Sequence, residues 1–104
     1  MCIRDSIRTA DIVVTGEGRL DSQTVMGKAP AGVASIAKEY RIPVIAFCGC
    51  ASDDAGVCND NGIDAFFPIL TGITTLEEAM SPDTARLNAS ATAKQVFRLI
   101  KALS

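Results

Sequence analysis

The sequence contains no histidine and no tryptophan, and only 5% of its 104 residues are aromatic. Histidine is the commonest general base and the commonest metal ligand in proteins, so its absence removes the simplest routes to acid–base catalysis and to zinc binding. Any proton transfer is therefore expected to involve an aspartate, a glutamate, a lysine or Tyr40.

Strong net charge and long apolar runs are also absent. The formal net charge is −2, which lacks the basic excess typical of proteins that bind nucleic acids or anionic membranes. No apolar run approaches the roughly 20 residues that span a bilayer, and no signal peptide begins the chain. The sequence thus predicts a cytoplasmic protein without a nucleic-acid or membrane partner.

Four cysteines are present, at Cys2, Cys48, Cys50 and Cys58. Without a secretory signal they are expected to be free structural thiols, because Cys48 and Cys50 end an apolar run where cysteine behaves as a small hydrophobic residue. A Cys-x-Cys pair with one further cysteine and no histidine is a poor zinc set. A metal or redox role remains the alternative.

The length of 104 residues fits one domain at most. Residues 1–9 show neither a helical period nor a capping residue, and are expected to form a disordered or weakly ordered leader. Within it, Met1 to Ser6 is interpreted as an appended sequence that is not native to the protein. Residues 10–104 are expected to form the folded part.

Three apolar runs predict strands at residues 11–15, 42–48 and 65–70, with Pro68 marking an edge or a bulge in the last. Helical spacing predicts helices at residues 30–40, from Ser52 to Asn61-Gly62, and from Ser81-Pro82 to the end, preceded by a capping box of Thr75 and Glu78. The resulting β-α-β-α-β-α order indicates an α/β fold of three layers with a mostly parallel sheet. Because three strands make a narrow sheet, the chain is expected to be an incomplete part of a larger fold.

The last predicted helix has a clear apolar stripe. Its members recur at helical spacing up to the C-terminus, and they are Ala93, Val96, Phe97, Ile100 and Leu103.

Ligands of parallel sheets gather at the carboxyl ends of the strands, where three polar loops are expected to meet. Each loop contains glycines and polar or charged residues that could contact a ligand. In the first loop they are Gly16, Glu17, Gly18, Arg19, Asp21, Ser22, Gln23, Thr24, Gly27 and Lys28; in the second they are Gly49, Ser52, Asp53 and Asp54; in the third they are Thr71, Gly72, Thr74 and Thr75.

The first loop has the side chains that phosphate chemistry needs. Its glycines would permit positive φ and let backbone N–H groups approach a ligand. Gly27-Lys28, directly before a helix, would form an anion-binding site. Arg19 could clamp a phosphate or carboxylate, while Asp21 or Glu17 could accept a proton or bind Mg²⁺. In the alternative reading, the glycines only make a tight turn and the two cations are solvated. The spacing matches neither the Walker A motif nor the dinucleotide fingerprint.

The second loop also has a simpler reading. Asp53 and Asp54 would most simply begin a short helix capped by Ser52, because carboxylates suit the first turn of a helix.

The stretch DIVVTGEGRLDSQTVMGKAPAGVASIAKEYRIPVIAFCG, residues 11–49, resembles the C-terminal part of bacterial two-domain glycerate kinases of the glycerate 2-kinase family. The family pattern T-G-E-G-R-x-D-x-Q-T-x-x-G-K-x-P-x-G-V-A runs from Thr15 to Ala34 without a gap. The resemblance extends from about Ala10 to Leu103, and the leader lies outside it.

This resemblance implies a two-domain α/β enzyme that uses ATP and Mg²⁺ to phosphorylate a hydroxyl of D-glycerate, giving phosphoglycerate and ADP. Carried over to this sequence, it implies catalytic roles for Asp21, Arg19 and Lys28, with Asp21 nearest the chemistry. The implied substrate- or phosphate-binding residues are Gly16, Glu17, Gly18, Gln23, Thr24 and Gly27.

The N-terminal and inserted regions of the family are absent from this chain. It is therefore expected to be a fragment that is inactive alone and that associates through an exposed apolar face or sheet edge. The alternative is a small stand-alone α/β module that binds an organic acid or a phosphate without turnover.

Overall fold

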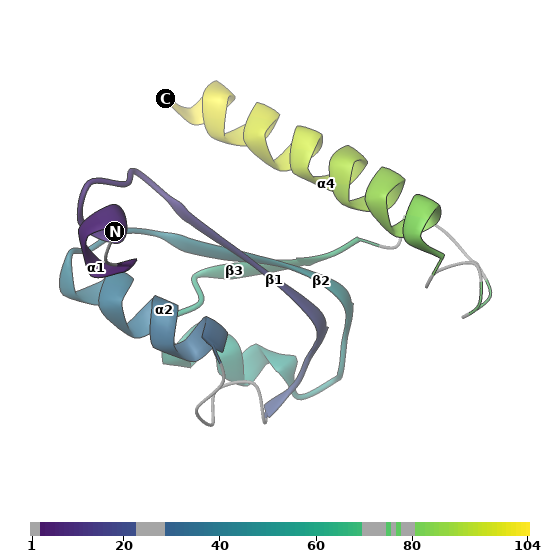
Figure 1. Ribbon diagram of the computed structural model, residues 1–104, viewed down its shortest axis with the longest axis horizontal. Helices are drawn as coiled ribbons and strands as arrows, with labels where there is room; N and C mark the ends of the chain where they lie inside the picture. Colours follow the sequence, from purple (N-terminus) through teal and green to yellow (C-terminus); the bar gives the residue numbers. More distant parts are fainter. Residues whose placement is uncertain (1–2, 23–28, 70–74, 76, 78–80) are drawn as a thin grey trace.

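Figure 1 shows the computed structural model, which describes all residues except 1–2, 23–28, 70–74, 76 and 78–80. The predicted α/β architecture is confirmed, with one further helix at the start of the chain and a 3₁₀ helix between the second and third strands. In chain order the elements are α1 (Ile3–Arg8), β1 (Val13–Leu20), α2 (Ala29–Glu39), β2 (Val44–Ala51), η2 (Ala55–Asn61), β3 (Ala65–Pro68) and α4 (Pro82–Leu103).

The three strands form a parallel sheet in the order β1-β2-β3. Strand β1 pairs with β2 from Val13 opposite Val44 to Leu20 opposite Ala51. Strand β3 pairs with the other side of β2 and ends at Pro68, opposite Cys48. In the described part of the chain β3 is an edge strand, which is where a proline that cannot donate to the ladder is tolerated.

The sheet has helices on both faces, and the two faces differ. Helices α2 and η2 lie against one face, which we call the covered face, and α4 crosses the other, which we call the open face (Figure 1). The core is on the covered face, where the fully buried side chains include Val44, Cys48, Cys58 and Ile63, packed against Ala34 and Ala37 of α2. Alternation along a strand sends neighbouring residues to the open face, and there Val14 is 45% exposed.

The ends of α2 and η2 follow the expected chemistry. The 3₁₀ helix η2 stops at Gly62, which has a φ of 100° in the left-handed region, as the Asn61-Gly62 pair predicted. Helix α2 ends at Glu39, and the turn that follows contains Arg41, a non-glycine residue with a φ of 57°. The Ile42 amide donates to the Ala37 carbonyl at 3.0 Å and closes the last turn.

The leader was expected to be disordered or weakly ordered, and the structure contradicts the first alternative. Residues Ile3–Arg8 form α1, whose Ile7 side chain is 6% exposed and belongs to the core. Arg4 forms an ion pair with Glu39 at the end of α2. The buried Ile7 and the Arg4–Glu39 ion pair connect this helix to the rest of the fold. Six residues are too few for a hydrophobic period to be visible in the sequence.

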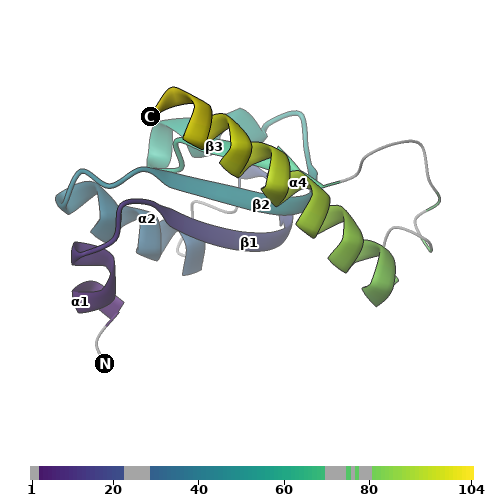
Figure 2. The same ribbon diagram turned by 90° about the horizontal axis from the view of Figure 1, so that it is seen from above.

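Helix α4 begins at Pro82 after Ser81, as predicted, but most of its apolar stripe is not buried. Val96 is 8% exposed, whereas Phe97, Ile100 and Leu103 are 41%, 37% and 79% exposed. Seen from above, α4 crosses the sheet obliquely and leaves much of β1 uncovered (Figure 2). The stripe was correctly found, but nothing in the described part of this chain covers most of it.

Two other predicted features lie outside the described residues: the capping box, through Glu78, and the end of the third strand, at Leu70. None of the helices in the described ranges combines the length and hydropathy needed to cross a membrane.

Candidate functional site

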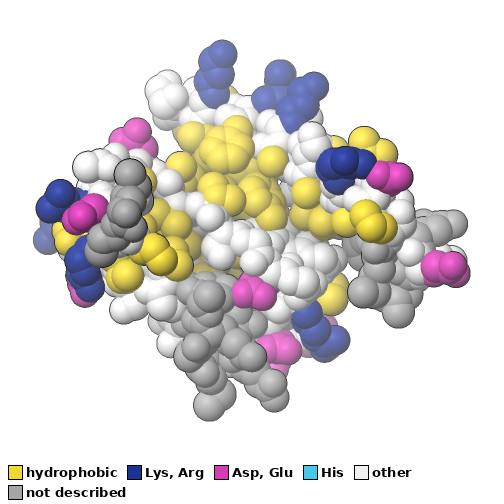
Figure 3. All heavy atoms as spheres, in the orientation of Figure 1, with side chains coloured by type: hydrophobic (Ala, Val, Ile, Leu, Met, Phe, Trp, Pro, Cys, Tyr) yellow, Lys and Arg dark blue, Asp and Glu magenta, His cyan; other side chains and the backbone are white. Residues whose placement is uncertain are grey.

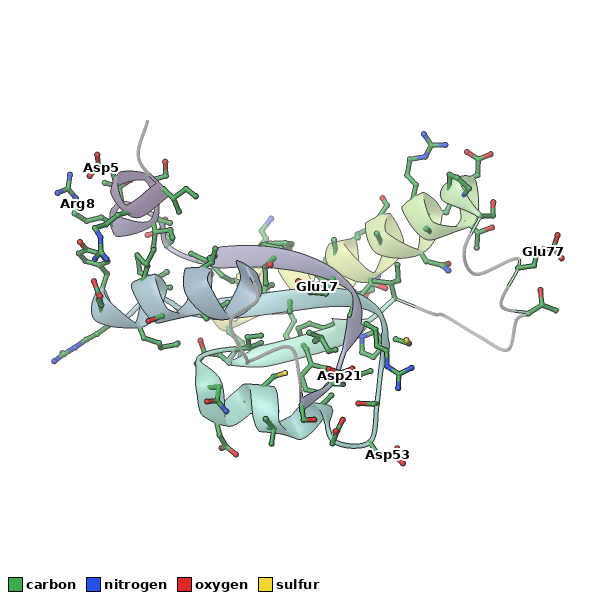
Figure 4. All side chains as sticks on the ribbon, turned by 60° about the horizontal axis from the view of Figure 1, so that its bottom comes forward. Asp5, Arg8, Glu17, Asp21, Asp53 and Glu77 are labelled. Atoms are coloured by element: carbon green, nitrogen blue, oxygen red, sulfur yellow. The ribbon has the colours of Figure 1, made fainter. Side chains whose placement is uncertain are left out.

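A polar hollow of about 380 Å³ lies where β1 and β2 end. Figure 4 shows two of its carboxylates, Asp21 and Asp53, at this end of the molecule, with Glu17 further back along β1. The hollow is lined by Arg19, Asp21, Ser22, Ser52, Asp53 and Asp54. The predicted convergence of the first two loops at the carboxyl ends of the strands therefore occurs.

The first loop begins later than predicted. Gly16 to Arg19 belong to β1, with Gly16 opposite Phe47, Glu17 opposite Cys48 and Arg19 opposite Cys50. Among the described glycines only Gly62 has a positive φ, so Gly16 and Gly18 do not use the positive φ that the sequence would permit. The prediction failed because glycine and charged residues disfavour strands locally, whereas pairing with the strongly apolar β2 keeps this segment extended.

Close packing of β1 against β2 requires glycine at one position of β2, Gly49. A Cβ atom added at Gly49 would lie 2.7 Å from the carbonyl oxygen of Gly18, closer than real Cβ contacts. A Cβ atom at Gly18 would meet nothing within 4 Å. The close approach therefore requires glycine at position 49 but not at position 18.

Arg19 and Asp21 form an ion pair at the rim of the hollow, with Arg19 Nε 3.7 Å from Asp21 Oδ2. The Arg19 side chain is 65% exposed and that of Asp21 is 30% exposed. A guanidinium carries five N–H donors, so one ion pair leaves it able to bind a phosphate or a carboxylate as well. The geometry brings together two of the three side chains predicted to be catalytic.

The segment after β2 supplies the opposite wall of the hollow. Ser52 donates its backbone N–H to the Leu20 carbonyl at 2.9 Å, which ties the end of β1 to this segment. The Ser52 hydroxyl lies 3.3 Å from the same carbonyl and also bonds to the Asp54 carboxylate. Hydrogen bonds from Ser52 and then from Ser22 hold the pKa of Asp54 below its ordinary value, so Asp54 is anionic at neutral pH.

The three described cysteines are free thiols. Burial, helped by the neighbouring Cys50 and Cys58, raises the pKa of Cys48 to about 11. Burial and then the charges of Asp21 and Asp54 also raise the pKa of Cys58, whose Sγ donates to the Asp21 carbonyl at 3.6 Å. A thiol with a raised pKa is a poor nucleophile and a poor metal ligand, which favours the structural role predicted for Cys48 and Cys58.

Asp21 and Glu17 are the two carboxylates predicted to bind Mg²⁺. The described residues contain no group of three or more His, Cys, Asp or Glu side chains that could hold a metal ion. Mg²⁺ is commonly bound through one or two protein carboxylates together with substrate phosphates and water, and Asp21 at the hollow suits that role. Glu17 lies mid-strand, opposite the buried Cys48, and is the weaker candidate.

Four predicted site residues, Gln23, Thr24, Gly27 and Lys28, lie outside the described residues, as do Thr71, Gly72 and Thr74 of the third loop. Conversely, Ser22, Ser52, Asp53 and Asp54 line the hollow but were not chosen as site residues. The sequence did place them in loops at the carboxyl ends of neighbouring strands. That position was the available signal, but the simpler interpretation of Asp53 and Asp54, as the start of a helix, was preferred.

Comparison with known proteins identifies the family. The sequence model of the glycerate kinase family matches residues 1–101. The chain belongs to the glycerate kinase family. The match begins at residue 1 and so includes the first nine residues, which were expected to lie outside the resemblance.

The glycerate kinase relatives are similar over most of this chain but are much longer. A glycerate 2-kinase of Escherichia coli is 51% identical over 77 residues, which is 74% of this chain and 20% of that protein. A glycerate kinase of Haemophilus influenzae is 44% identical over 96 residues, which is 92% of this chain and 25% of that protein. This chain thus spans about a fifth to a quarter of the length of these relatives.

A solved structure supports the fold. A crystal structure described as a candidate glycerate kinase 2 from Salmonella typhimurium LT2 superposes with a TM-score of 0.67 and 40% sequence identity. The superposition covers 96% of this chain and 23% of that chain. The α/β arrangement described above is therefore one portion of a larger glycerate kinase fold.

Proposed function

We propose that this chain carries part of the active site of a kinase that transfers phosphate from ATP to a hydroxyl of D-glycerate, giving phosphoglycerate and ADP. The observation that carries the proposal is the Arg19–Asp21 pair at the rim of the hollow where β1 and β2 end. A cation beside a carboxylate at the carboxyl ends of parallel strands suits the binding of an anionic substrate near a group that can orient a hydroxyl. Membership of the glycerate kinase family names the substrate class.

The residues of the pair have separate roles in this proposal. Arg19 binds an anionic group, either the glycerate carboxylate or a phosphate, because its exposed guanidinium suits planar oxyanions. Asp21 accepts a proton from, or orients, the attacking hydroxyl, and it is also the residue that would hold Mg²⁺. When bound, Mg²⁺ would neutralise charge on the phosphates. Lys28, in the same segment of the sequence, is proposed as a second anion-binding cation.

The chain alone is proposed to be inactive. Phosphate transfer needs the phosphate donor, the metal ion and the acceptor hydroxyl held together. The open hollow at the ends of β1 and β2 cannot enclose all three. The purified 104-residue chain is expected to show no glycerate-dependent release of ADP. Turnover above that of a Lys28→Ala variant would contradict this expectation.

The site assignment can be tested in a chimera in which this chain replaces the matching region of the Haemophilus influenzae relative. Arg19→Ala in this chimera is expected to raise KM for D-glycerate or ATP at least about tenfold, because a charge-assisted hydrogen bond to an anion is lost. Arg86→Ala is the matched control, since Arg86 is also largely exposed, at 76% against 65% for Arg19, but pairs with Asp83 on α4. Equal effects of the two substitutions, or none from Arg19→Ala, would overturn the assignment.

A further inference from the structure

We propose that Ser52 and Asp54 are positioning residues that hold Asp21 and Ser22, the first two residues after β1, at the edge of the hollow. The sequence placed both residues in the second polar loop, but neither the sequence nor the proposed mechanism gave them a role in the site. The inference rests on the proposed function, because it explains how the Arg19–Asp21 pair is held in place.

Ser52 connects the two segments through two different groups. Its backbone N–H donates to the Leu20 carbonyl at 2.9 Å, while its hydroxyl has two acceptors in reach, that carbonyl at 3.3 Å and the Asp54 carboxylate. A hydroxyl has a single proton, and a bond to an ionised acceptor is the stronger of the two. The Ser52 hydroxyl therefore donates its hydrogen bond to Asp54, and the Ser52 backbone N–H alone holds the end of β1.

Asp54 then reaches the first loop directly. Its carboxylate accepts a hydrogen bond from Ser22 in addition to the one from Ser52. One anionic side chain thus links the segment after β1 to the segment after β2. Because Asp54 lies at the protein surface, this link can be removed without opening the core.

The residues on either side of Ser22 are anchored as well. The Leu20 side chain is fully buried, and the Asp21 carbonyl accepts a bond from the Cys58 thiol at 3.6 Å. The buried Leu20 side chain and the Cys58 thiol therefore hold the backbone of Leu20 and Asp21, and Asp54 holds Ser22. Together these contacts determine where the Asp21 carboxylate sits relative to Arg19, which is 3.7 Å away.

The positioning role is tested first in the purified chain, by amide hydrogen exchange measured with NMR. Asp54→Ala is expected to speed exchange at Asp21 and Ser22 at least about tenfold, while the core amides of Val44 and Ile63 keep their protection. Asp54→Asn keeps an acceptor oxygen and should give an intermediate rate. Asp60→Ala is the matched control, an exposed aspartate of η2 away from the hollow. Equal exchange at Asp21 and Ser22 in the Asp54 and Asp60 variants would overturn the proposal.

Ser52 provides an independent variant. Ser52→Ala removes the hydroxyl that bonds to Asp54 but keeps the backbone N–H, so exchange at Ser22 should rise while the Ser52 amide stays protected. Ser52→Thr restores a hydroxyl and is expected to restore slow exchange. Fast exchange in the threonine variant as well would contradict a role for the hydroxyl.

The effect on catalysis is tested in the chimera with the Haemophilus influenzae relative. Asp54→Ala is expected to lower kcat at least about tenfold with a smaller change in KM and an unchanged Tm, because Asp21 is misplaced while the binding cations remain. Asp60→Ala should leave both constants unchanged. Unchanged kcat in the Asp54 variant would overturn the positioning role. If the unsubstituted chimera is folded but inactive, the proposed function fails, while the exchange measurements still decide whether Asp54 holds the loop.

Discussion

The two faces of the sheet differ in how far this chain covers them. On the covered face, Val44 and Cys48 are no more than 1% exposed beneath α2 and η2. On the open face, Val14 is 45% exposed, and Phe97 and Leu103 of α4 are 41% and 79% exposed. The difference shows that hydrophobic periodicity identifies a face that can be buried and not what buries it.

The open face also contains a groove between α4 and β3. It has a volume of about 630 Å³, and its apolar lining includes Phe67, Val96 and Leu99. In the view of Figure 3 hydrophobic side chains gather between α4 and the strands. Contiguous apolar surface of this kind usually marks a contact with another protein part. Because the chain spans 20% to 25% of its relatives, we expect the remainder of the family fold to pack there.

The largest expected effect comes from comparing two isoleucines, one for each face. Ile63 is fully buried against the covered face, whereas Ile100 on α4 is 37% exposed. Ile63→Ala is expected to cost about 2–5 kcal/mol of unfolding free energy, and Ile100→Ala less than about 1 kcal/mol, because only the first leaves a cavity. Urea denaturation of the purified chain measures both. Equal losses would mean that α4 packs as tightly as the core.

The next effect tests the close approach of β1 and β2. Gly49→Ala places a Cβ atom 2.7 Å from the Gly18 carbonyl and is expected to cost about 1–3 kcal/mol. Gly18→Ala is the matched control, because its Cβ atom would meet nothing within 4 Å. Thermal melts should therefore separate the two variants clearly. A Gly18 variant that is as unstable as the Gly49 variant would contradict this packing.

A smaller effect concerns the junction of α2, β2 and β3. Burial of Asp64 raises its pKa, but hydrogen bonds from Lys38 and the Val44 amide outweigh burial and leave the pKa below the ordinary 3.8. A lowered folded-state pKa means that this contribution to stability is present above about pH 4 and is lost as the pH falls further. Urea denaturation between pH 5 and pH 2 should show it, and Asp64→Asn should flatten that part of the profile. An unchanged profile in the variant would contradict the assignment.

The smallest effect on stability is expected on the open face, where association should change instead. Leu103→Lys replaces a side chain that is 79% exposed, so the Tm should shift by no more than about 2 °C. Self-association and binding of a hydrophobic dye should both decrease, as measured by size-exclusion chromatography and fluorescence. A monomeric parent chain that binds no dye would remove the contrast between the faces and favour a stand-alone module. Such a module should also melt at a higher temperature when D-glycerate or phosphate is added.

The sequence predicted the architecture well because the buried elements have strong local signals. The run at residues 44–48 is almost wholly apolar, and Asn61-Gly62 ends η2 where a left-handed residue is needed. Arg19 and Asp21 were correctly placed at the carboxyl end of β1. The errors arose where a long-range contact decides the structure. Pairing with β2 extends β1 through Gly16 to Leu20, and the contact of Ile7 with the core holds α1.

The wall of the hollow formed by Ser52 and Asp54 was hidden for the same reason. Their partners, Leu20 and Ser22, are about thirty residues away in the chain, and no local pattern records such a bond. Only the register of β1 and β2 brings them together.

The most direct test of the central claim is one assay of glycerate-dependent ADP release on two samples, the purified chain and the chimera with the Haemophilus influenzae relative. The account predicts turnover by the chimera within about tenfold of that relative and none by the chain alone, because the chain supplies a working part of the site but not its enclosure. A folded chimera that releases no ADP, or a chain that turns over by itself, would contradict it.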